Sequence, residues 1–564
     1  MPLKVLVCSM LLSGATLAWA TVYHVAQNDA ASDDNPGTKE APWRTISRSL
    51  STVQPGDTVQ IHAGTYREWV RPQVSGTAAA PIAFAGAPGE EIVLTGADLV
   101  TGWERQEGPD PIYRHGPWTA RFAVSQDSDG NPVYHHPGDD RHWLIGRCEQ
   151  VIVDGRLLDQ VLTRDELRPG SFFADLDGQG LYVWLADGSD PATHTVEAST
   201  RQWVFGYNPW SGEGRADYIQ LRNVTIRYAA NHAQRGALWV GGDGWRLENV
   251  VVEWTNGCGV GIGFRGCQVD NLVSRDNGQM GMGGSPESAY LQHVKLLDNN
   301  RKGYDTGWEA GGMKFAFARD TVLSDFEAAG NDGPGIWFDI DNRGSVIRRS
   351  VCHDNTGHGI FIEISGGFII TNNLCYGNGT GGSWGSAGIC VGESEDCLIE
   401  HNTCVDNPNG ISIREQGPRD FEGRFGRPCS YRVRNFVSQY NICAYNTEYQ
   451  FGLWSDNSFF GPHPSPEVGL QGTPLDPAAA NLRLDHNCYF ASDGQSMVLW
   501  GAPWRERHRK YTDLATFTAE HGQDAASVVA EPPFFDRSGR DYRLRAEGDV
   551  WTRGFGALFL RPER

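Results

Sequence analysis

A short strand motif recurs through the middle of the chain at nearly regular spacing. Each copy is a glycine followed by an apolar–x–apolar run, and the copies begin at Gly259, Gly281, Gly312, Gly335, Gly359, Gly388 and Gly410. The intervals are 22, 31, 23, 24, 29 and 22 residues. One three-sided coil of parallel strands needs a period of this size, whereas a propeller blade needs about 40 residues. The repeat therefore predicts an all-β fold, a right-handed parallel β-helix of the pectate-lyase-like type.

The spacing and regularity of the strand repeat change along the chain, and these changes suggest five segments. We expect a signal peptide over 1–20, an N-terminal cap and first coils over 21–100, an inserted β-rich module over 101–200, the central β-helix with the active site over 201–445, and the last coils with a C-terminal tail over 446–564. Within the insert, "EQVIVDGRLLDQV" and "GQGLYVWLADGSD" alternate like antiparallel strands with tight turns, which predicts a β-sandwich-like module. "PWRTISRSL" (Pro42 to Leu50) predicts an amphipathic helix that caps the open end of the solenoid.

The N-terminal residues indicate where the protein is located, and the net charge limits the kinds of partner it can bind. Lys4 is followed by a mostly apolar stretch and by the small-residue cleavage site Ala18-Trp19-Ala20, so we expect a secreted or periplasmic protein with a bacterial-type cleaved signal. No later apolar run is long enough to span a bilayer. The formal net charge of −21 argues against a nucleic-acid partner, because nucleic-acid binding needs basic patches. The oligomeric state stays open.

Four cysteines share one position in the repeat. Each stands three residues before an asparagine, in the pairs Cys352–Asn355, Cys375–Asn378, Cys404–Asn407 and Cys443–Asn446. Recurrence at one register predicts an inward column of packed thiols beside an asparagine ladder, in preference to disulfides or metal ligands.

Alternation within the repeated strands places two acidic residues on the outer face. Ile336, Phe338, Ile360 and Ile362 are expected to point inward, which leaves Asp339 and Glu363 outward. These two carboxylates are 24 residues apart, one coil, and adjacent coils lie about 4.8 Å apart. Retaining glycosidases place their carboxylates about 5 to 5.5 Å apart, so Asp339 and Glu363 are the candidate catalytic pair.

The surroundings of this pair favour a carbohydrate site. Trp337 is expected to be an exposed aromatic that stacks on a sugar, and Lys314 adds a cation one coil away. The insertion "RKGYDTGWEAG" is expected to form a loop that brings Trp308 and Glu309 over the same face. The remaining substrate-binding candidates on this side are Asp341 and Arg414.

The segments "GWEAGGMKFAFARD", "GPGIWFDID" and "GIFIEIS" resemble the active-site segments of the β-xylosidases of glycoside hydrolase family 120. The resemblance extends to "YREWVRP" (Tyr66 to Pro72) and to an early β-sandwich module. It implies a nucleophile at Asp339, an acid/base at Glu363, and substrate-hydroxyl contacts at Glu309 and Lys314. The chain departs from the family where Trp308 replaces a histidine and where "NHAQRGALWVGGDG" replaces an aromatic, proline-rich segment.

The sequence thus favours a secreted retaining glycoside hydrolase, xylosidase-like, acting on an oligo- or polysaccharide of plant or microbial origin without a cofactor. One alternative is a Ca²⁺-dependent polysaccharide lyase or C5-epimerase on uronate polymers, with Lys314 as base and Asp339 or Asp341 holding the ion. The other is a non-catalytic glycan-binding solenoid. The sugar, the linkage, exo or endo action and bound calcium are not determined by the sequence.

Overall fold

The structure is a computed structural model. It describes residues 20–560 except 124, 127–131, 134–144, 208–211, 383–384, 416–418, 424–425, 456–479, 493 and 502–508. The expected signal peptide therefore lies, apart from Ala20, outside the described residues.

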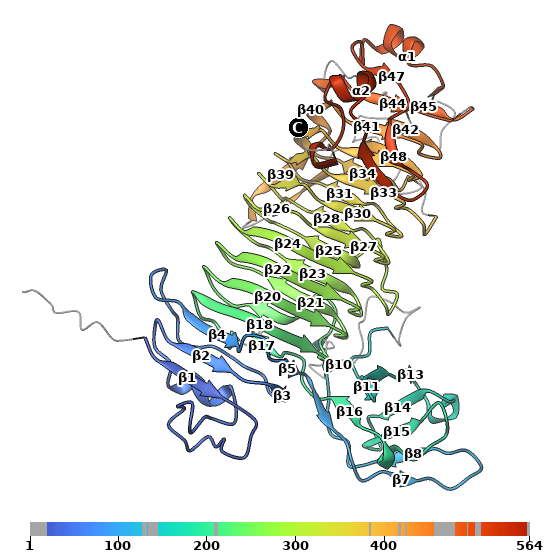
Figure 1. Ribbon diagram of the computed structural model, residues 1–564. Helices are drawn as coiled ribbons and strands as arrows, with labels where there is room; N and C mark the ends of the chain where they lie inside the picture. The colour runs from blue at the N-terminus through green and yellow to red at the C-terminus, as the bar shows by residue number, and fades with distance from the viewer. Residues whose placement is uncertain are drawn as a thin grey trace, which may run out of the picture.

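The body of the molecule is a stack of parallel strands that rises from the N-terminal coils to the C-terminal region (Figure 1). One face of the stack is a sheet in which each strand pairs in parallel with its counterpart one coil later. Its parallel strands in stacking order are β17 (Phe205–Gly206), β19 (Gly236–Val240), β21 (Cys258–Ile262), β23 (Met280–Gly284), β25 (Gly311–Phe315), β28 (Ile336–Asp339), β31 (Ile360–Glu363), β34 (Ala387–Gly392), β37 (Asn409–Glu415), β42 (Tyr449–Ser455) and β45 (Ser496–Trp500). The last strand, β46 (Arg509–Tyr511), pairs antiparallel with β45. We call this sheet the front sheet.

The other two faces start as one bent sheet and then separate. Four long strands contribute to both faces: β18 (Ile219–Arg227), β20 (Arg246–Glu253), β22 (Gln268–Arg275) and β24 (Tyr290–Leu297). Each bends at a residue with positive φ, such as Asn249 at 53° and Asn271 at 56°, because asparagine adopts this backbone conformation more readily than most residues. In later coils β24 is succeeded by the separate short strands β26 (Val322–Ser324) and β27 (Glu327–Ala329).

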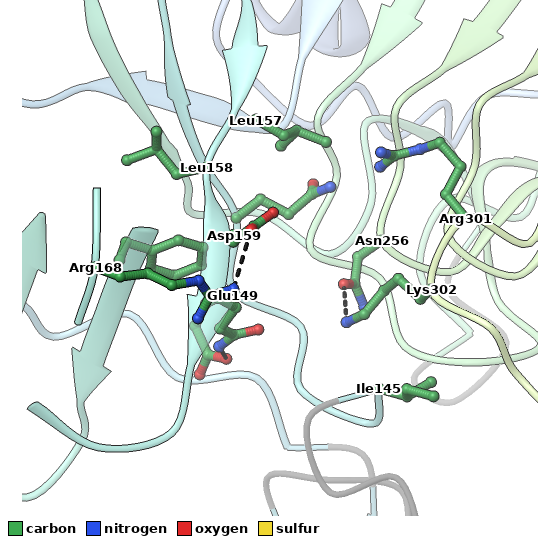
Figure 2. A pocket seen from close by; sticks show the side chains of 12 residues that line it. Ile145, Glu149, Leu157, Leu158, Asp159, Arg168, Asn256, Arg301 and Lys302 are labelled. Atoms are coloured by element: carbon green, nitrogen blue, oxygen red, sulfur yellow. Dashed lines mark hydrogen bonds and ion pairs between the residues drawn. The ribbon is translucent and has the colours of Figure 1, made fainter. Parts of the chain in front are cut away.

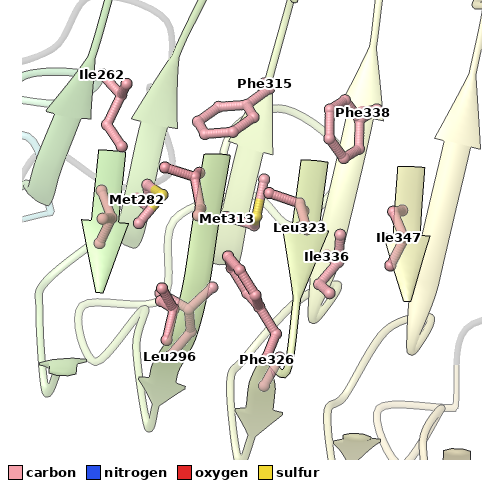
Figure 3. Packing of buried hydrophobic residues seen from close by; sticks show 14 of the residues in the cluster. Ile262, Met282, Leu296, Met313, Phe315, Leu323, Phe326, Ile336, Phe338 and Ile347 are labelled. Atoms are coloured by element: carbon pink, nitrogen blue, oxygen red, sulfur yellow. The ribbon is translucent and has the colours of Figure 1, made fainter. Parts of the chain in front are cut away.

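The interior of the stack is an apolar column (Figure 3). Ile262, Met282, Met313, Phe315, Ile336 and Phe338 project inward from successive strands of the front sheet. The four residues predicted to point inward, Ile336, Phe338, Ile360 and Ile362, have no exposed surface. The alternation that places Asp339 and Glu363 on the outer side is thereby confirmed.

The predicted thiol column and asparagine ladder are also present. Cys352, Cys375, Cys404 and Cys443 are register partners on adjacent coils, and all are free and buried. The amide of Asn355 donates to Asn378 at 2.8 Å, and the amide of Asn378 donates to Asn407 at 3.0 Å. Satisfying these buried amides along the stack removes the cost of desolvating them.

The N-terminal end differs from the expected helix. Pro42 to Leu50 contains only a 3-10 turn, η1 (Ser47–Ser51). Trp43 is instead bridged to Val25 of β1 (Val22–Val25), so this part of the segment is held by the first strand. The Glu68 carboxylate accepts from the backbone N–H groups of Ile46 and Ser47, both at 2.8 Å, which satisfies the start of the turn.

The inserted module is built from two small sheets beside the first coils (Figure 1). One contains β12 (Arg156–Leu157), β11 (Val151–Val153), β16 (Val196–Ser199) and β6 (Ala97–Leu99); the other contains β13 (Asp159–Val161), β14 (Ser171–Asp175), β15 (Gly180–Trp184), β8 (Tyr113–His115) and β7 (Glu104–Arg105). They share a separate apolar core that includes Val151, Phe172 and Leu181. This arrangement confirms the β-sandwich-like insert.

The C-terminal region ends the stack and returns along its side. Helix α1 (Leu514–His521) packs on the last strands through Leu514 and Phe517. The hairpin β48 (Phe534–Asp536) and β49 (Asp541–Leu544) and helix α2 (Gly548–Thr552) pack against outer side chains of earlier coils, among them Leu374 and Ile442.

Candidate functional site

Asp339 and Glu363 are register partners at the ends of β28 and β31. Because both strands belong to the front sheet and are neighbours in it, the two carboxylates occupy equivalent positions on adjacent coils. Adjacent parallel strands lie about 4.8 Å apart, which is the separation that the sequence spacing predicted. Their side chains are 10 % and 14 % exposed, so both lie in a largely covered part of the outer face.

Lys314 joins the first carboxylate to the loop. From β25, its Nζ lies 2.8 Å from Asp339 Oδ2 and 3.6 Å from Glu309 Oε1, and it donates to the Trp308 carbonyl at 2.6 Å. Burial raises the pKa of Glu309, the charge of Lys314 and a hydrogen bond from Gln234 oppose the rise, and the charge of Asp339 adds to it. Lys314, Asp339 and Glu309 thus form one buried charged group with Lys314 at its centre.

Trp337 is not the exposed aromatic that we expected. Its side chain does point away from the core, but the residue is only 2 % exposed. The Lys314 ammonium lies 3.7 Å from its ring centroid, and the ring stacks on Phe361 at 5.3 Å. Strand alternation gave its direction correctly but not its exposure, because neighbouring side chains on the same face cover the ring. Trp337 therefore forms part of the floor under Lys314.

Glu363 has its own cation. The Arg414 guanidinium, which comes from β37 two coils later, hydrogen-bonds to Glu363 and lies 3.4 Å from the buried carboxylate of Glu393. The same guanidinium covers the Phe361 ring at 5.2 Å. Arg414 is thus brought to the pair as predicted, whereas Glu393 was missed because it follows the strand β34 at a corner, with a φ of 40°.

Asp341 is placed apart from this group. Ile340 and Asp341 have φ values of 64° and 52°, so the chain leaves the strand after Asp339 and alternation no longer applies. The Asp341 carboxylate pairs with Arg319 at 2.7 Å, lies 3.5 Å from Arg343, and accepts from the Tyr431 hydroxyl at 2.6 Å. With 2 % of the residue exposed and these partners, Asp341 serves to hold the corner in this structure, and its predicted binding role has no support in the geometry.

The loop over 301–310 connects the site to the inserted module. The Tyr304 hydroxyl donates to the Ile145 carbonyl at 2.9 Å, and Lys302 donates to the Arg147 carbonyl and to Asn256. At the other end of the loop, Trp308 packs in a small apolar cluster with Tyr304 and Ile145. The prediction that this loop brings Trp308 and Glu309 to the front sheet is confirmed by their contacts with Lys314.

His358 is a further residue on the outer face, next to Phe361, and the sequence pattern gave no sign of it because it lies in a turn. Its ring lies 4.6 Å from that of Phe361, and its Nδ1 accepts the Ala387 backbone N–H at 3.0 Å. An accepting Nδ1 requires the proton of the neutral ring to be on Nε2. Burial and the charge of Arg414 lower the pKa of His358 to about 3. The ring is therefore neutral near pH 7, with an N–H at Nε2 that has no partner among the described residues.

Within the described residues, no group of three or more His, Cys, Asp or Glu side chains is arranged to hold a metal ion. None of the helices in the same part of the chain has the length and apolarity of a membrane span.

Comparison with known proteins supports the architecture. A family model described as a right handed beta helix region matches residues 216–402, and one described as a protein of unknown function (DUF1565) matches residues 30–73. The uncharacterized protein YwoF of Bacillus subtilis (strain 168) is 42 % identical over 68 residues, which is 12 % of this chain. The match spans only 14 % of that protein's length.

Among solved structures, XylC in complex with xylose has a TM-score of 0.63 and 17 % identity, covering 86 % of this chain and 87 % of that chain. The A-module of Azotobacter vinelandii mannuronan C-5 epimerase AlgE6 has a TM-score of 0.45 and 13 % identity, over 89 % and 97 %. The family GH136 lacto-N-biosidase from Eubacterium ramulus has a TM-score of 0.37 and 9 % identity, over 91 % and 67 %. At 17 % identity the likeness to XylC is one of fold, and it confirms the right-handed parallel β-helix that the resemblance implied.

Proposed function

We propose that this protein is a retaining glycoside hydrolase, exported from the cell, with Asp339 as nucleophile and Glu363 as acid/base. The observation that carries the proposal is the register pairing of the two carboxylates on adjacent coils. Neighbouring parallel strands lie about 4.8 Å apart, which is closer to the 5 to 5.5 Å between the carboxyl groups of retaining enzymes than to the about 6.5 to 9.5 Å of inverting enzymes. A xyloside is the first sugar to test, because the likeness to XylC and the matched segments both point to it.

The contacts of Asp339 suit a nucleophile. An ammonium at 2.8 Å favours the ionised carboxylate, and attack on an anomeric carbon requires that form. Lys314 is itself held by the Trp308 carbonyl and by Glu309, so the position of the Asp339 carboxylate is restrained from several sides. A restrained nucleophile loses less entropy when the covalent glycosyl intermediate forms.

Glu363 would give a proton to the leaving oxygen and then accept one from the attacking water. It is paired with Arg414, whose positive charge is shared with Glu393. The two catalytic carboxylates therefore have different cations, Lys314 for Asp339 and Arg414 for Glu363. Arg414 favours the ionised form of Glu363, which suits the second step, in which Glu363 accepts a proton from water.

The lyase or epimerase alternative receives less support from the same contacts. A lyase base must be a free amine, but Lys314 lies in ion pairs with Asp339 and Glu309. A calcium site shared by Asp339 and Asp341 would need both carboxylates together, and Asp341 is instead bound to Arg319 and Tyr431. The front sheet would also need a row of cations to bind a uronate polymer, and near the pair it offers Lys314 and Arg414, both engaged by carboxylates.

The deciding experiment follows the anomeric configuration of the first product. The purified protein is screened against aryl glycosides, including aryl β-xylosides, and against uronate polymers, with proton NMR for the hydrolysed sugar and ultraviolet absorbance for unsaturated products. We expect hydrolysis of a glycoside with retained configuration. An inverted first product, or unsaturated products from a uronate polymer, would rule out the assignment.

A further inference from the structure

A cavity of about 430 Å³ lies between the inserted module and the corner of the coils, and neither Asp339 nor Glu363 lines it (Figure 2). Its volume is within the range of about 300 to 1,000 Å³ that is typical of small-ligand sites. Leu157, Leu158 and Phe172 contribute from the module, and Asn256, Arg301 and Lys302 contribute from the coils. The module side is mixed, because Glu149, Asp159 and Arg168 also line it, and the side formed by the coils is polar and basic.

The basic wall carries two cations that form no ion pair with a carboxylate among the described residues, although the charge of Asp276 acts on Arg301 and that of Glu149 on Lys302. Arg301 donates from Nε to the Asp276 carbonyl at 2.7 Å, and its guanidinium lies over the Trp254 ring at 4.3 Å. Its two terminal nitrogens form no hydrogen bond within the described part of the chain. Lys302 donates only to neutral oxygens, those of Arg147 and Asn256. In Figure 2 both side chains extend from the coils toward the module.

The acidic residues of the same cavity are already neutralised. The Glu149 carboxylate receives two hydrogen bonds from Arg147, both at 2.9 Å, and one from Gln160 at 3.0 Å. Asp159 pairs with Arg168 at 3.1 Å. Both carboxylates of the cavity are therefore already bound by arginines of the module, Arg147 and Arg168, and neither forms an ion pair with Arg301 or Lys302.

Holding these two side chains beside the cavity disfavours their charged forms. Burial lowers the pKa of Lys302 to about 8 and also lowers the pKa of Arg301. Arg301 is an exposed residue and Lys302 is half-buried, so the cost falls mainly on Lys302, and an anion in the cavity would relieve it. Perturbed groups of this kind in a concave site mark ligand-binding positions more often than ordinary surface does.

We propose that this cavity is an accessory subsite for a sugar unit that carries a carboxylate, a uronic acid residue, with its carboxylate bound by Arg301 and Lys302. Leu157 and Leu158 would contact the apolar face of the sugar ring, whereas Phe172, at 1 % exposed, belongs to the core of the module. The choice of a sugar as the carrier of the carboxylate rests on the proposed function. Since Arg301 and Lys302 begin the loop that carries Trp308 and Glu309, an acidic unit bound here would also hold the base of that loop.

The test is a direct binding measurement on the full chain, by calorimetry or saturation-transfer NMR, with D-glucuronate as the probe and D-glucose as its neutral counterpart. We expect glucuronate to bind at least about 10-fold more tightly than glucose, since a charge-assisted hydrogen bond contributes about 1.5 to 3 kcal/mol. Arg301→Gln should weaken glucuronate binding by about 10-fold or more. Arg265→Gln, which removes an exposed arginine far from the cavity, should leave it unchanged.

A second variant keeps both cations and fills the space. Leu157→Trp should abolish glucuronate binding while leaving catalysis of a simple aryl glycoside within about 2-fold, because it lies outside the catalytic group. Equal binding of glucose and glucuronate, unchanged binding in Arg301→Gln, or inorganic sulfate binding as tightly as glucuronate would overturn the proposal. These outcomes are separate from the anomeric test, so either the accessory subsite or the hydrolase assignment can fail alone.

Discussion

Asp339 and Glu363 are paired directly across two adjacent parallel strands, and each carboxylate has a different cation. This relationship depends on the coil length between β28 and β31, since a residue inserted or removed in the strand would turn one side chain to the interior. The placement of the proposed catalytic pair is therefore a consequence of the repeat that also builds the fold.

Asp339→Ala and Glu363→Ala should reduce enzymatic activity at different steps of the reaction. Without Asp339 no covalent intermediate forms, so turnover should fall about 10³-fold or more even for aryl glycosides with good leaving groups. Glu363→Ala should retain the first step for those substrates and stall the second, and added azide should restore turnover by attacking without a general base. Steady-state and burst kinetics distinguish the two patterns. Glu327→Gln, an exposed acid on another face, serves as the control.

Lys314→Met should lower both activity and stability, because it leaves the carboxylate of Asp339 in a buried site without its cation. Breaking one side of a buried ion pair costs about 3 to 5 kcal/mol, so a clear drop in the melting temperature is expected. Lys314→Arg keeps the charge and should recover part of both losses. A Lys314→Met protein that is fully active and equally stable would show that the ion pair has no role in holding Asp339.

Tyr304→Phe should loosen the loop over 301–310 without unfolding the protein. The hydroxyl donates to the Ile145 carbonyl at 2.9 Å, and one neutral hydrogen bond contributes about 1 kcal/mol. We expect KM to rise about 3- to 5-fold while kcat changes less than 2-fold. Tyr290→Phe, which removes an exposed hydroxyl on another face, should change neither constant. Identical kinetics in Tyr304→Phe and the wild type would mean that the loop is positioned by other contacts.

The buried carboxyl of Asp524 predicts a pH-dependent stability. Burial raises its pKa from 3.8 to about 6, against hydrogen bonds from Ser527, Asn487 and Tyr489. Because the folded-state pKa is raised, the contribution to stability is fully present below about pH 4 and is lost as the pH rises through about 6. Asp524→Asn should therefore stabilise the protein at pH 7.5 by about 1 to 3 kcal/mol and have little effect at pH 4. Calorimetry at both pH values tests this, and an equal change at both would contradict it.

The strand register was accessible from the sequence because it follows from a period of two within each strand and one coil between strands. That is why Asp339 and Glu363, the inward isoleucines and the cysteine column could all be placed before the structure. The pattern could not show what covers a residue. Trp337 points outward as predicted, yet Lys314 and Phe361 bury it.

The pattern also failed where strands end. Asp341 was grouped with the outward residues, but positive φ at Ile340 and Asp341 ends the alternation and directs the carboxylate to Arg319. Glu393 and His358 belong to corners for the same reason, and corners have no period from which direction can be inferred. The expected helix over 42–50 likewise gave way to a bridge between Trp43 and Val25, a tertiary contact that local propensity does not contain.

His358 should act as a neutral hydrogen-bond donor at the substrate site. Its Nδ1 accepts from Ala387, which leaves the proton on Nε2, and a pKa lowered to about 3 by burial and Arg414 keeps the ring uncharged above about pH 4. His358→Phe should raise KM about 10-fold through the loss of one substrate hydrogen bond, whereas His358→Gln, which keeps an N–H, should recover most of it. The pH–rate profile should be unchanged between pH 5 and 8 in both variants. An equal rise in KM in His358→Phe and His358→Gln would show that the ring acts only by packing on Phe361.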